Sequence, residues 1–234
     1  MAKEPRVVFG RAYGAFFVST GQNDLHQHVA FQIVLSAEDD ITVVDENNDS
    51  FTGRFILIKP LTLSKFRCDG PVTHLFLSPI MGLTLDLINL VGDANIHILT
   101  STQELPFNPE SSPDEILDVL DNSGQKSIER LDSRLLAVLE DLDQNLDNPS
   151  ILKAAKRCGL SRSRVRTIAR QQLGIPLSTW ITWRKLVAAN KALSAGADLQ
   201  EAALEGHFAD HAHFSRTMKK MFGVTPTEAL RIYT

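Results

Sequence analysis

Two clusters of basic residues near the end of the chain carry the side chains best suited to bind a polyanion. The first cluster is Arg162, Arg164, Arg166 and Arg170. The second cluster is His211, His213, Arg216, Lys219 and Lys220. Arginine can bind guanine or phosphate through paired hydrogen bonds, whereas lysine mainly binds phosphate as a point charge. These residue types therefore indicate nucleic acid as the partner, if helices present them on one face.

Apolar residues in each cluster have the spacing of a helix with one buried face. They are Val165, Ile168 and Ala169 in the first cluster, and Phe214, Met218 and Phe222 in the second. A helix that is basic on one face and apolar on the other suits the DNA major groove. A single arginine is more often a solvated surface charge, so the prediction depends on having two such helices.

The two clusters belong to a unit that occurs twice. Residues 150–174 and 198–223 each predict a short helix, a tight turn, a longer helix and a final glycine. A further helix, Ser178–Leu193, separates the two units. Ser161 and Asp210 are the expected N-caps of the two longer helices. The arrangement predicts two helix-turn-helix units.

The charge distribution agrees with a division into two modules. Residues 1–149 carry 10 Lys and Arg against 23 Asp and Glu, whereas residues 150–234 carry 14 against 5. An acidic front and a basic back indicate that the second module binds an anionic partner. Cys68 and Cys158 lie far apart and predict neither a disulfide nor a cysteine metal site.

The C-terminal residues resemble the DNA-binding domain of AraC/XylS-type transcription regulators. The most specific stretches are GLSRSRVRTIARQQLGIP, WRKLVAANKAL and EAALEGHFADHAHFSRTMKKMFGVTPTEAL, and the resemblance covers roughly Leu131–Arg231. It implies that both longer helices enter successive major-groove segments on one face of double-stranded DNA. It also implies RNA polymerase as a partner if the protein is an activator.

The resemblance assigns roles to individual residues. The base-reading residues would be Ser163, Arg166, Thr167, His211, Ala212 and Arg216. The phosphate or flanking contacts would be Arg162, Arg164, Arg170, Lys219 and Lys220. Two departures from the family pattern bear on these roles. His207 stands where the family usually has glycine, with Gly206 one position earlier, which leaves open whether the turn keeps its position or shifts onto Gly206. Thr167 stands where many members have arginine.

The first 80 residues predict strands and the later residues predict helices. The strand-like runs are RVVFG, AYGAFFVST, HVAFQIVLS, ITVVDEN, FTGRFILIKP and VTHLFLSP, separated by turn-rich pieces. We expect an α+β chain: a small β-barrel or cupin-like domain at 1–100, a linker with a short helix at 101–130, and an all-α DNA-binding domain at 131–234. The leucine stripe of Leu131–Leu146 predicts a helix whose stripe packs into a core, with a dimer seam as the alternative.

The strands around His26 and His28 resemble the cupin-like sensor domains that precede this DNA-binding domain in many family members. Metal-binding cupins add a glutamate and a later histidine, but Phe31 or Gln32 and Ser64 occupy those positions here. We therefore expect no metal and no other cofactor. We expect a small-molecule effector instead, bound by His26, His28, Gln32 and His74.

Three functions are compatible with these observations. The first is an effector-controlled transcription regulator, with no catalytic residues. The second is a regulator that binds DNA constitutively and has an unliganded β-domain, and the third is a cupin metalloenzyme with a helical appendage. The absence of a signal-peptide pattern and of a long apolar run predicts a cytoplasmic protein that does not enter membranes. A homodimer is left open, through the leucine stripe, the Met81–Val91 helix or an edge of the β-domain.

Overall fold

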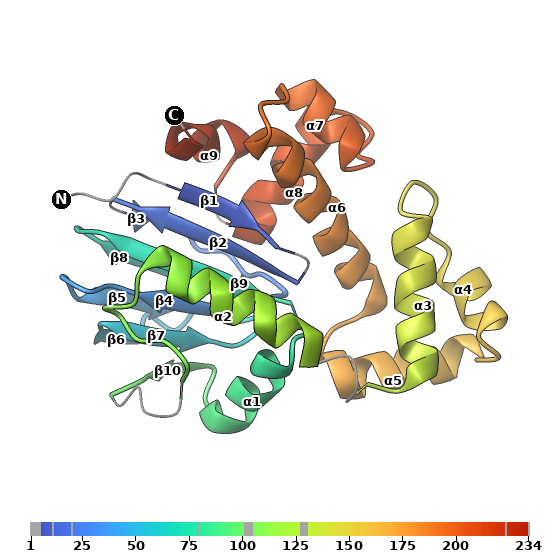
Figure 1. Ribbon diagram of the computed structural model, residues 1–234, viewed down its shortest axis with the longest axis horizontal. Helices are drawn as coiled ribbons and strands as arrows, with labels where there is room; N and C mark the ends of the chain where they lie inside the picture. Colours follow the sequence, from blue (N-terminus) through green and yellow to red (C-terminus); the bar gives the residue numbers. More distant parts are fainter. Residues whose placement is uncertain are drawn as a thin grey trace.

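The computed structural model describes residues 6–10, 12–19, 21–78, 80–100, 105–126, 131–222 and 224–233, and confirms the α+β class (Figure 1). The strands are β1 (Arg6–Phe9), β2 (Tyr13–Val18), β3 (Gly21–Gln22), β4 (Phe31–Leu35), β5 (Ile41–Asp45), β6 (Ser50–Gly53), β7 (Phe55–Ile58), β8 (Ser64–Cys68), β9 (Val72–Leu77) and β10 (Ile96–Ile98). The helices are α1 (Gly82–Val91), α2 (Pro113–Lys126), α3 (Ser133–Gln144), α4 (Ile151–Arg157), α5 (Arg162–Leu173), α6 (Leu177–Ser194), α7 (Leu199–Glu205), α8 (His211–Phe222) and α9 (Pro226–Tyr233). We call the strands with α1 and α2 the β-region, and α3–α9 the helical region.

Within the described residues, the strands form two antiparallel sheets that pack face to face. The order is β1-β2-β9-β4-β7-β10 in the larger sheet and β3-β8-β5-β6 in the smaller one. Between them lies an apolar layer that includes Val34 and Ile56 of the larger sheet and Ile41 and Val43 of the smaller one. Strands β4 and β9 are almost wholly buried, as their continuous apolar runs predict.

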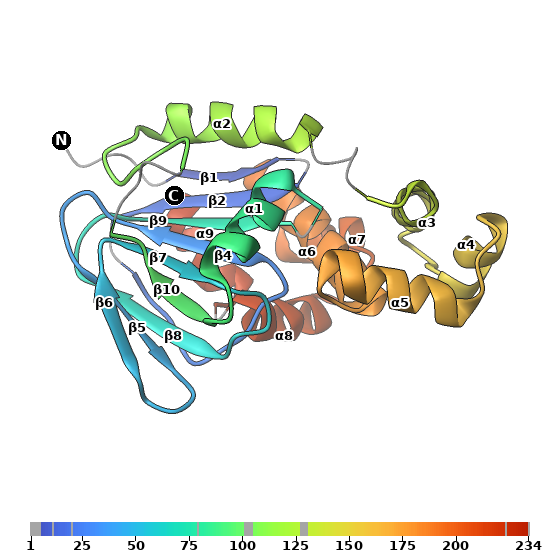
Figure 2. The same cartoon turned by 90° about the horizontal axis from the view of Figure 1, so that it is seen from below.

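The outer face of the larger sheet is covered by α1 and α2 (Figure 2). The expected linker, 101–130, contains α2, whose Ile116, Leu117 and Leu120 are buried against this sheet. Residues 101–104 and 127–130 of that linker lie outside the described residues. The amphipathic pattern of α2 therefore places this helix in the core of the β-region.

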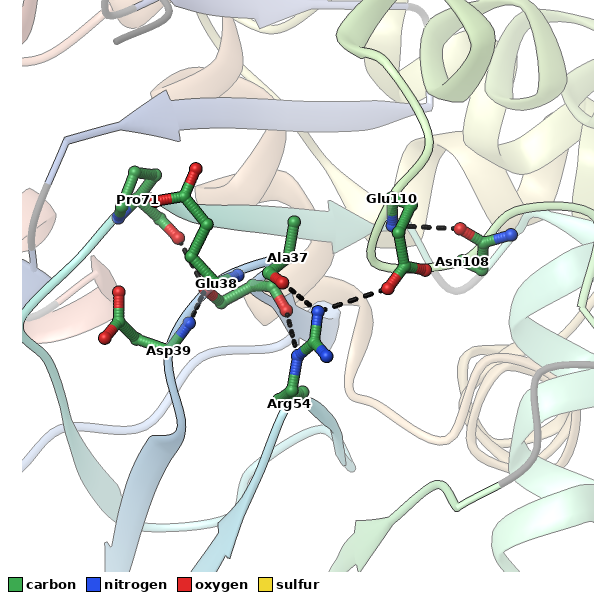
Figure 3. Close-up of polar contacts among 8 residues, drawn as sticks. Ala37, Glu38, Asp39, Arg54, Pro71, Asn108 and Glu110 are labelled. Carbon is green, nitrogen blue, oxygen red and sulfur yellow. Dashed lines mark hydrogen bonds and ion pairs between the residues drawn. The ribbon is translucent and has the colours of Figure 1, made fainter. Parts of the chain in front are cut away.

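Arg54 separates two strands that the sequence predicted as one run. The run FTGRFILIKP forms β6 in the smaller sheet and β7 in the larger one. The Arg54 guanidinium donates to the carbonyl oxygens of Ser36 and Ala37 and to Glu110 Oε1, the last at 3.1 Å (Figure 3). Arg54 thus joins the turn after β4 to the segment before α2.

The helical region has one continuous core built around α6. Trp180 and Trp183 of α6 are buried in it. The leucine stripe of α3 is also part of this core, because Leu135, Leu139 and Leu142 are buried. Helix α3 contacts α4, α5 and α6, so the stripe packs inside the protein, as expected, and is not available as a dimer seam.

Candidate nucleic-acid interface

The first helix-turn-helix unit is α4, a turn and α5. Gly159 follows the C-cap of α4 with a φ of 69°, and the N–H of Leu160 donates to Ala155 O at 2.8 Å. This closes the end of α4 with a left-handed residue. The hydroxyl of Ser161 accepts from the N–H of Arg164 at 3.1 Å, which confirms Ser161 as the N-cap of α5.

Helix α5 exposes every side chain that we predicted to contact DNA. Val165, Ile168 and Ala169 are buried in the helical core. The exposed residues are Arg162, Ser163, Arg164, Arg166, Thr167 and Arg170. Within the part of the chain that the structure describes, none of these arginines takes part in an ion pair. The face is therefore polar and cationic.

The second unit, α7, a turn and α8, repeats the geometry of the first. The N–H of Phe208 donates to Ala203 O at 2.9 Å, as that of Leu160 donates to Ala155 O in the first unit. His207 has a φ of 53° and occupies the left-handed position that Gly159 has in the first unit. The turn has therefore not moved onto Gly206, and it keeps the left-handed geometry with a histidine at that position.

Gly206 has a separate role, which is to let α7 approach α6. A Cβ atom at Gly206 would lie 2.7 Å from Ala189 Cβ and 2.8 Å from the carbonyl oxygen of Lys185. The backbone oxygen cannot move away without distorting α6, so only glycine fits. The sequence alone suggested that this glycine and His207 were alternatives, whereas the structure uses both.

Helix α8 carries the second predicted DNA-contacting face. Phe214, Met218 and Phe222 are buried, as the helical spacing predicted. His211, Arg216 and Lys220 are exposed, while Ala212 and Lys219 are half-buried. The N–H of His213 donates to Asp210 Oδ1 at 2.6 Å, which confirms Asp210 as the cap. His211 is additionally hydrogen-bonded through Nδ1 to the side chain of Gln200.

Helix α6 fixes the separation of the two units. It lies between the α3–α5 group and the α7–α9 group, and both groups pack into its core (Figure 1). Arg184 of α6 forms an ion pair with Asp143 of α3 at 2.8 Å and lies over the Trp180 ring. In Figures 1 and 2 the α3–α5 group projects away from the strands, whereas α8 lies beside them.

The four residues predicted to bind an effector lie together inside the β-region. His26, His28, Gln32 and His74 are all buried. The Gln32 side-chain amide lies 2.7 Å from His28 Nε2 and 3.0 Å from His74 Nδ1. The His26 and His28 rings lie 5.5 Å apart between centroids. We call these four residues the histidine cluster.

Hydrogen-bond partners fix the proton positions in the cluster. His28 Nδ1 lies 2.9 Å from Ala30 O and must donate, so its Nε2 accepts. With Oε1 of Gln32 toward this Nε2, two acceptors would face each other, so the amide is turned with its NH2 group toward His28. The amide oxygen then accepts from His74 Nδ1, and Nε2 of His74 carries a lone pair.

Burial keeps these rings neutral. It lowers the pKa of His28 to about 4 and that of His74 to about 3, and it lowers the pKa of His26 as well. His26 Nδ1 donates to Asp24 O at 2.9 Å. Among the described residues, Nε2 of His26 and Nε2 of His74 have no hydrogen-bond partner. Both are lone pairs, so the cluster can accept hydrogen bonds from a donor group.

Among the described residues, no group of three or more His, Cys, Asp or Glu side chains is arranged to hold a metal ion. Ser64, at the position where metal cupins have a histidine, pairs through its backbone with His26. No helix in the described ranges is both long and apolar enough to span a bilayer.

One contact at the interface was not predicted from the sequence, namely the ion pair between Asp24 and Lys219. Lys219 Nζ lies 2.8 Å from Asp24 Oδ2 and 3.8 Å from Glu228 Oε2. Asp24 belongs to the loop before β4, far from α8 in the sequence. Two of the residues predicted to bind an effector, His26 and His28, lie in the same loop as Asp24.

These features define a class of protein: a β-region with a buried polar cluster, joined to a duplicated helix-turn-helix region. A family model described as a helix-turn-helix domain matches residues 154–232. YkgA of Escherichia coli (strain K12), named as an HTH-type transcriptional regulator, is 34% identical over 96 residues. That stretch covers 40% of this chain and 40% of YkgA, so the chain matches less than half of that relative's length.

Solved structures share the whole architecture. ToxT from Vibrio cholerae has a TM-score of 0.56 at 13% identity, covering 95% of this chain and 99% of that one. ToxT of strain SCE256 bound to unsaturated fatty acid has a TM-score of 0.55 at 12% identity, covering 96% and 97%. At such identities the likeness concerns the fold alone. Together with the matched domain, it supports the resemblance of the C-terminal residues to the DNA-binding domain of AraC/XylS-type regulators.

Proposed function

We propose that this chain is a sequence-specific transcription regulator that binds double-stranded DNA through α5 and α8. The observation that carries the proposal is the duplicated unit, which presents two cationic helix faces held at a fixed separation by α6. Each face has the side-chain chemistry for one major-groove segment. The cupin metalloenzyme has less support, because Phe31 or Gln32 and Ser64 stand where metal-binding cupins have a glutamate and a later histidine.

The proposed contacts divide into two kinds. Base readers are the residues near the first turns of each helix and Arg216: Ser163, Arg166, Thr167, His211, Ala212 and Arg216. Phosphate or flanking contacts are the remaining cations: Arg162, Arg164, Arg170, Lys219 and Lys220. Phosphate contacts set the orientation on the duplex and base contacts set the sequence that is preferred.

The full chain should bind its own promoter region with a steep salt dependence. Each phosphate contact releases condensed counterions, so the logarithm of the association constant should fall with a slope of about −0.9 per contact against the logarithm of salt concentration. Gel-shift titrations at several salt concentrations measure the slope. An interaction that is absent, or that does not respond to salt, would reject the proposed function.

The histidine cluster supports a second part of the proposal, a small-molecule effector bound in the β-region. His26 and His74 offer buried lone pairs, so the effector should donate a hydrogen bond from a hydroxyl or N–H group. ToxT bound to unsaturated fatty acid shares the fold and makes a long-chain ligand the first choice of probe. A ligand that binds only the folded state raises its melting temperature.

Two probes of the same chain length test the effector proposal. Oleyl alcohol carries a donor hydroxyl, whereas oleate carries an acceptor carboxylate at neutral pH. We expect the alcohol to raise the melting temperature more, and His74→Leu to remove that difference. If neither probe changes the melting temperature or the DNA affinity, the constitutive regulator with an unliganded β-region is favoured.

The remaining assignments are part of the same proposal. Residues 1–100 would bind the effector, 101–130 would connect, and 131–234 would bind DNA in the cytoplasm. RNA polymerase is a partner if the protein activates transcription. If the chain forms a homodimer, α1 or an edge of the β-region would mediate it, because the stripe of α3 is buried.

A further inference from the structure

One predicted DNA contact is already engaged within the protein. Lys219 Nζ on α8 lies 2.8 Å from Asp24 Oδ2, in a loop of the β-region. An open groove of about 600 Å³ runs beside this pair, between the 24–27 loop and the side of α8 that carries Arg216 and Lys220. The loop therefore faces the same side of α8 that carries its cations.

We propose that Asp24 acts as an intramolecular competitor for DNA, occupying Lys219 and so lowering the DNA affinity of α8. The inference rests on the proposed function. A carboxylate and a phosphate oxygen both accept hydrogen bonds from the same ammonium group. A phosphate that approaches Lys219 must displace Asp24 or bear the repulsion of a second negative charge close by.

The two helix-turn-helix units differ in this respect. The arginines of α5 take part in no ion pair within the described part of the chain, and α5 points away from the β-region in Figures 1 and 2. Lys219 of α8, by contrast, has Asp24 at 2.8 Å and Glu228 at 3.8 Å. The competition thus acts on one of the two DNA-contacting helices.

The loop that carries Asp24 is held in place by the histidine cluster. His26 Nδ1 donates to the backbone oxygen of Asp24 at 2.9 Å. The backbone of His26 also exchanges two hydrogen bonds with Ser64, at 3.0 and 2.9 Å. The buried imidazole of His26 therefore holds the backbone of Asp24 at the position from which its carboxylate reaches Lys219.

Helix α8 is held against the β-region from its own side. Phe222 packs on Phe76 at 5.2 Å and on Phe16 at 6.3 Å between ring centroids. Trp183 of α6 lies 5.5 Å from the same ring. The aromatic contact keeps Lys219, three residues before Phe222, within reach of Asp24.

The test compares Asp24→Asn with Asp69→Asn in the full chain. Asp69 is a matched control, because its side chain is 77% exposed against 79% for Asp24, and it pairs with Arg67 of its own region at 3.0 Å. We expect Asp24→Asn to raise DNA affinity about two- to fivefold, the range that an exposed ion pair accounts for. Asp69→Asn should leave the affinity unchanged.

A double-mutant cycle separates the ion pair from a general effect of charge. In the Lys219→Ala background, Asp24→Asn should raise DNA affinity less than in the wild type, because only the repulsion between Asp24 and phosphate is then removed. Equal gains from both aspartate variants, or an undiminished gain without Lys219, would overturn the proposal.

A second readout does not require DNA. Brief acetylation of the full chain, followed by mass spectrometry, measures the reactivity of the Lys219 amine. We expect faster acetylation of Lys219 in Asp24→Asn than in the wild type, with no change in Asp69→Asn. Faster acetylation without DNA binding would reject only the proposed function, whereas unchanged reactivity would overturn the ion pair itself.

Discussion

Burial decides the protonation of the three histidines in the cluster, and this links the stability of the protein to pH. The pKa of His28 is lowered to about 4 and that of His74 to about 3, against about 6.5 in the unfolded chain. At a pH between the folded-state pKa values and the unfolded value of about 6.5, the unfolded chain binds protons that the folded protein does not bind. The stability that the neutral forms of His28 and His74 contribute is therefore fully present above about pH 6.5 and is lost as the pH falls toward their folded-state pKa values.

We expect the free energy of unfolding to fall by about 1.4 kcal/mol per pH unit for each such histidine between pH 6 and pH 5. Urea titrations at closely spaced pH values measure this slope. His74→Leu should reduce the slope by the contribution of one histidine. A slope that is the same in wild type and variant would mean that His74 is protonated in the folded protein.

The two kinds of DNA contact on α8 should be separable by substitution. Arg216→Ala should cost about 1–3 kcal/mol at the preferred sequence and relax the preference at one operator position. Lys220→Ala should weaken binding evenly across sequences, because a phosphate contact carries no sequence information. Competition with randomised operators distinguishes the two patterns, and identical behaviour would show that our roles for these positions are wrong.

Single residues were predictable from the sequence where helical spacing alone decides their exposure. The cations of α5 fall opposite Val165 and Ile168, so their exposure follows from the 3.6-residue period. The pairing of Asp24 with Lys219 has no such origin, because it depends on how the β-region packs against α8. The orientation of the Gln32 amide likewise depends on two histidines and Ala30, which no local pattern relates.

At the level of elements, the turns of the two units offer a direct comparison. His207→Gly should raise the free energy of unfolding by about 1 kcal/mol, because glycine adopts a left-handed φ without steric cost. Gly159→Ala should lower it by about the same amount, since φ is 69° there and the space around it is open. Thermal denaturation of both variants measures the pair, and a destabilising His207→Gly would contradict the repeat geometry.

Gly206 should respond differently, because its constraint is space and not φ. Gly206→Ala would bring a Cβ within 2.8 Å of Lys185 O, so α7 must move away from α6. We expect a loss of about 1–3 kcal/mol, the usual cost of overpacking. A neutral Gly206→Ala, in the same denaturation series, would mean that α7 adjusts freely against α6.

The sequence predicted the helices of this chain better than its strands. Cap residues such as Ser161 and Asp210 marked the helix starts, and the structure confirms them. Strand β8 was missed because Lys65 and Arg67 alternate with only Phe66 and Cys68 as apolar neighbours, a weak strand pattern. The division of one run at Arg54 was missed because its cause is tertiary, namely the bonds of Arg54 to the turn after β4.

At the scale of the whole molecule, the two regions share one core. Phe16 and Phe76 of the larger sheet belong to the same apolar cluster as Trp183 and Phe222 of the helical region. Rings from both regions meet edge to face or tilted, at 5.2 to 6.3 Å between centroids. A shared core of this kind couples the unfolding of the two regions.

Phe16→Ala should uncouple them. Removing this ring should lower the free energy of unfolding by about 3–5 kcal/mol. The loss should mainly weaken the contact between the β-region and the helical region. Both tryptophans of the chain, Trp180 and Trp183, lie in α6, so their fluorescence reports only the helical region. Hydrogen exchange of β2 and β9 reports the β-region. In the wild type we expect both probes to give the same midpoint in urea, and in Phe16→Ala we expect two midpoints.

Phe17→Ala is the matched control for this experiment. Phe17 is the next residue of β2, 6% exposed against 7% for Phe16, but it faces α1 and α2 instead of α8. The loss of its ring should destabilise the protein by a similar amount and leave the two probes coincident, because the contact between the regions is intact. Coincident probes in both variants would mean that the regions are coupled by α6 and α9 against β1, and that the aromatic contact contributes only stability.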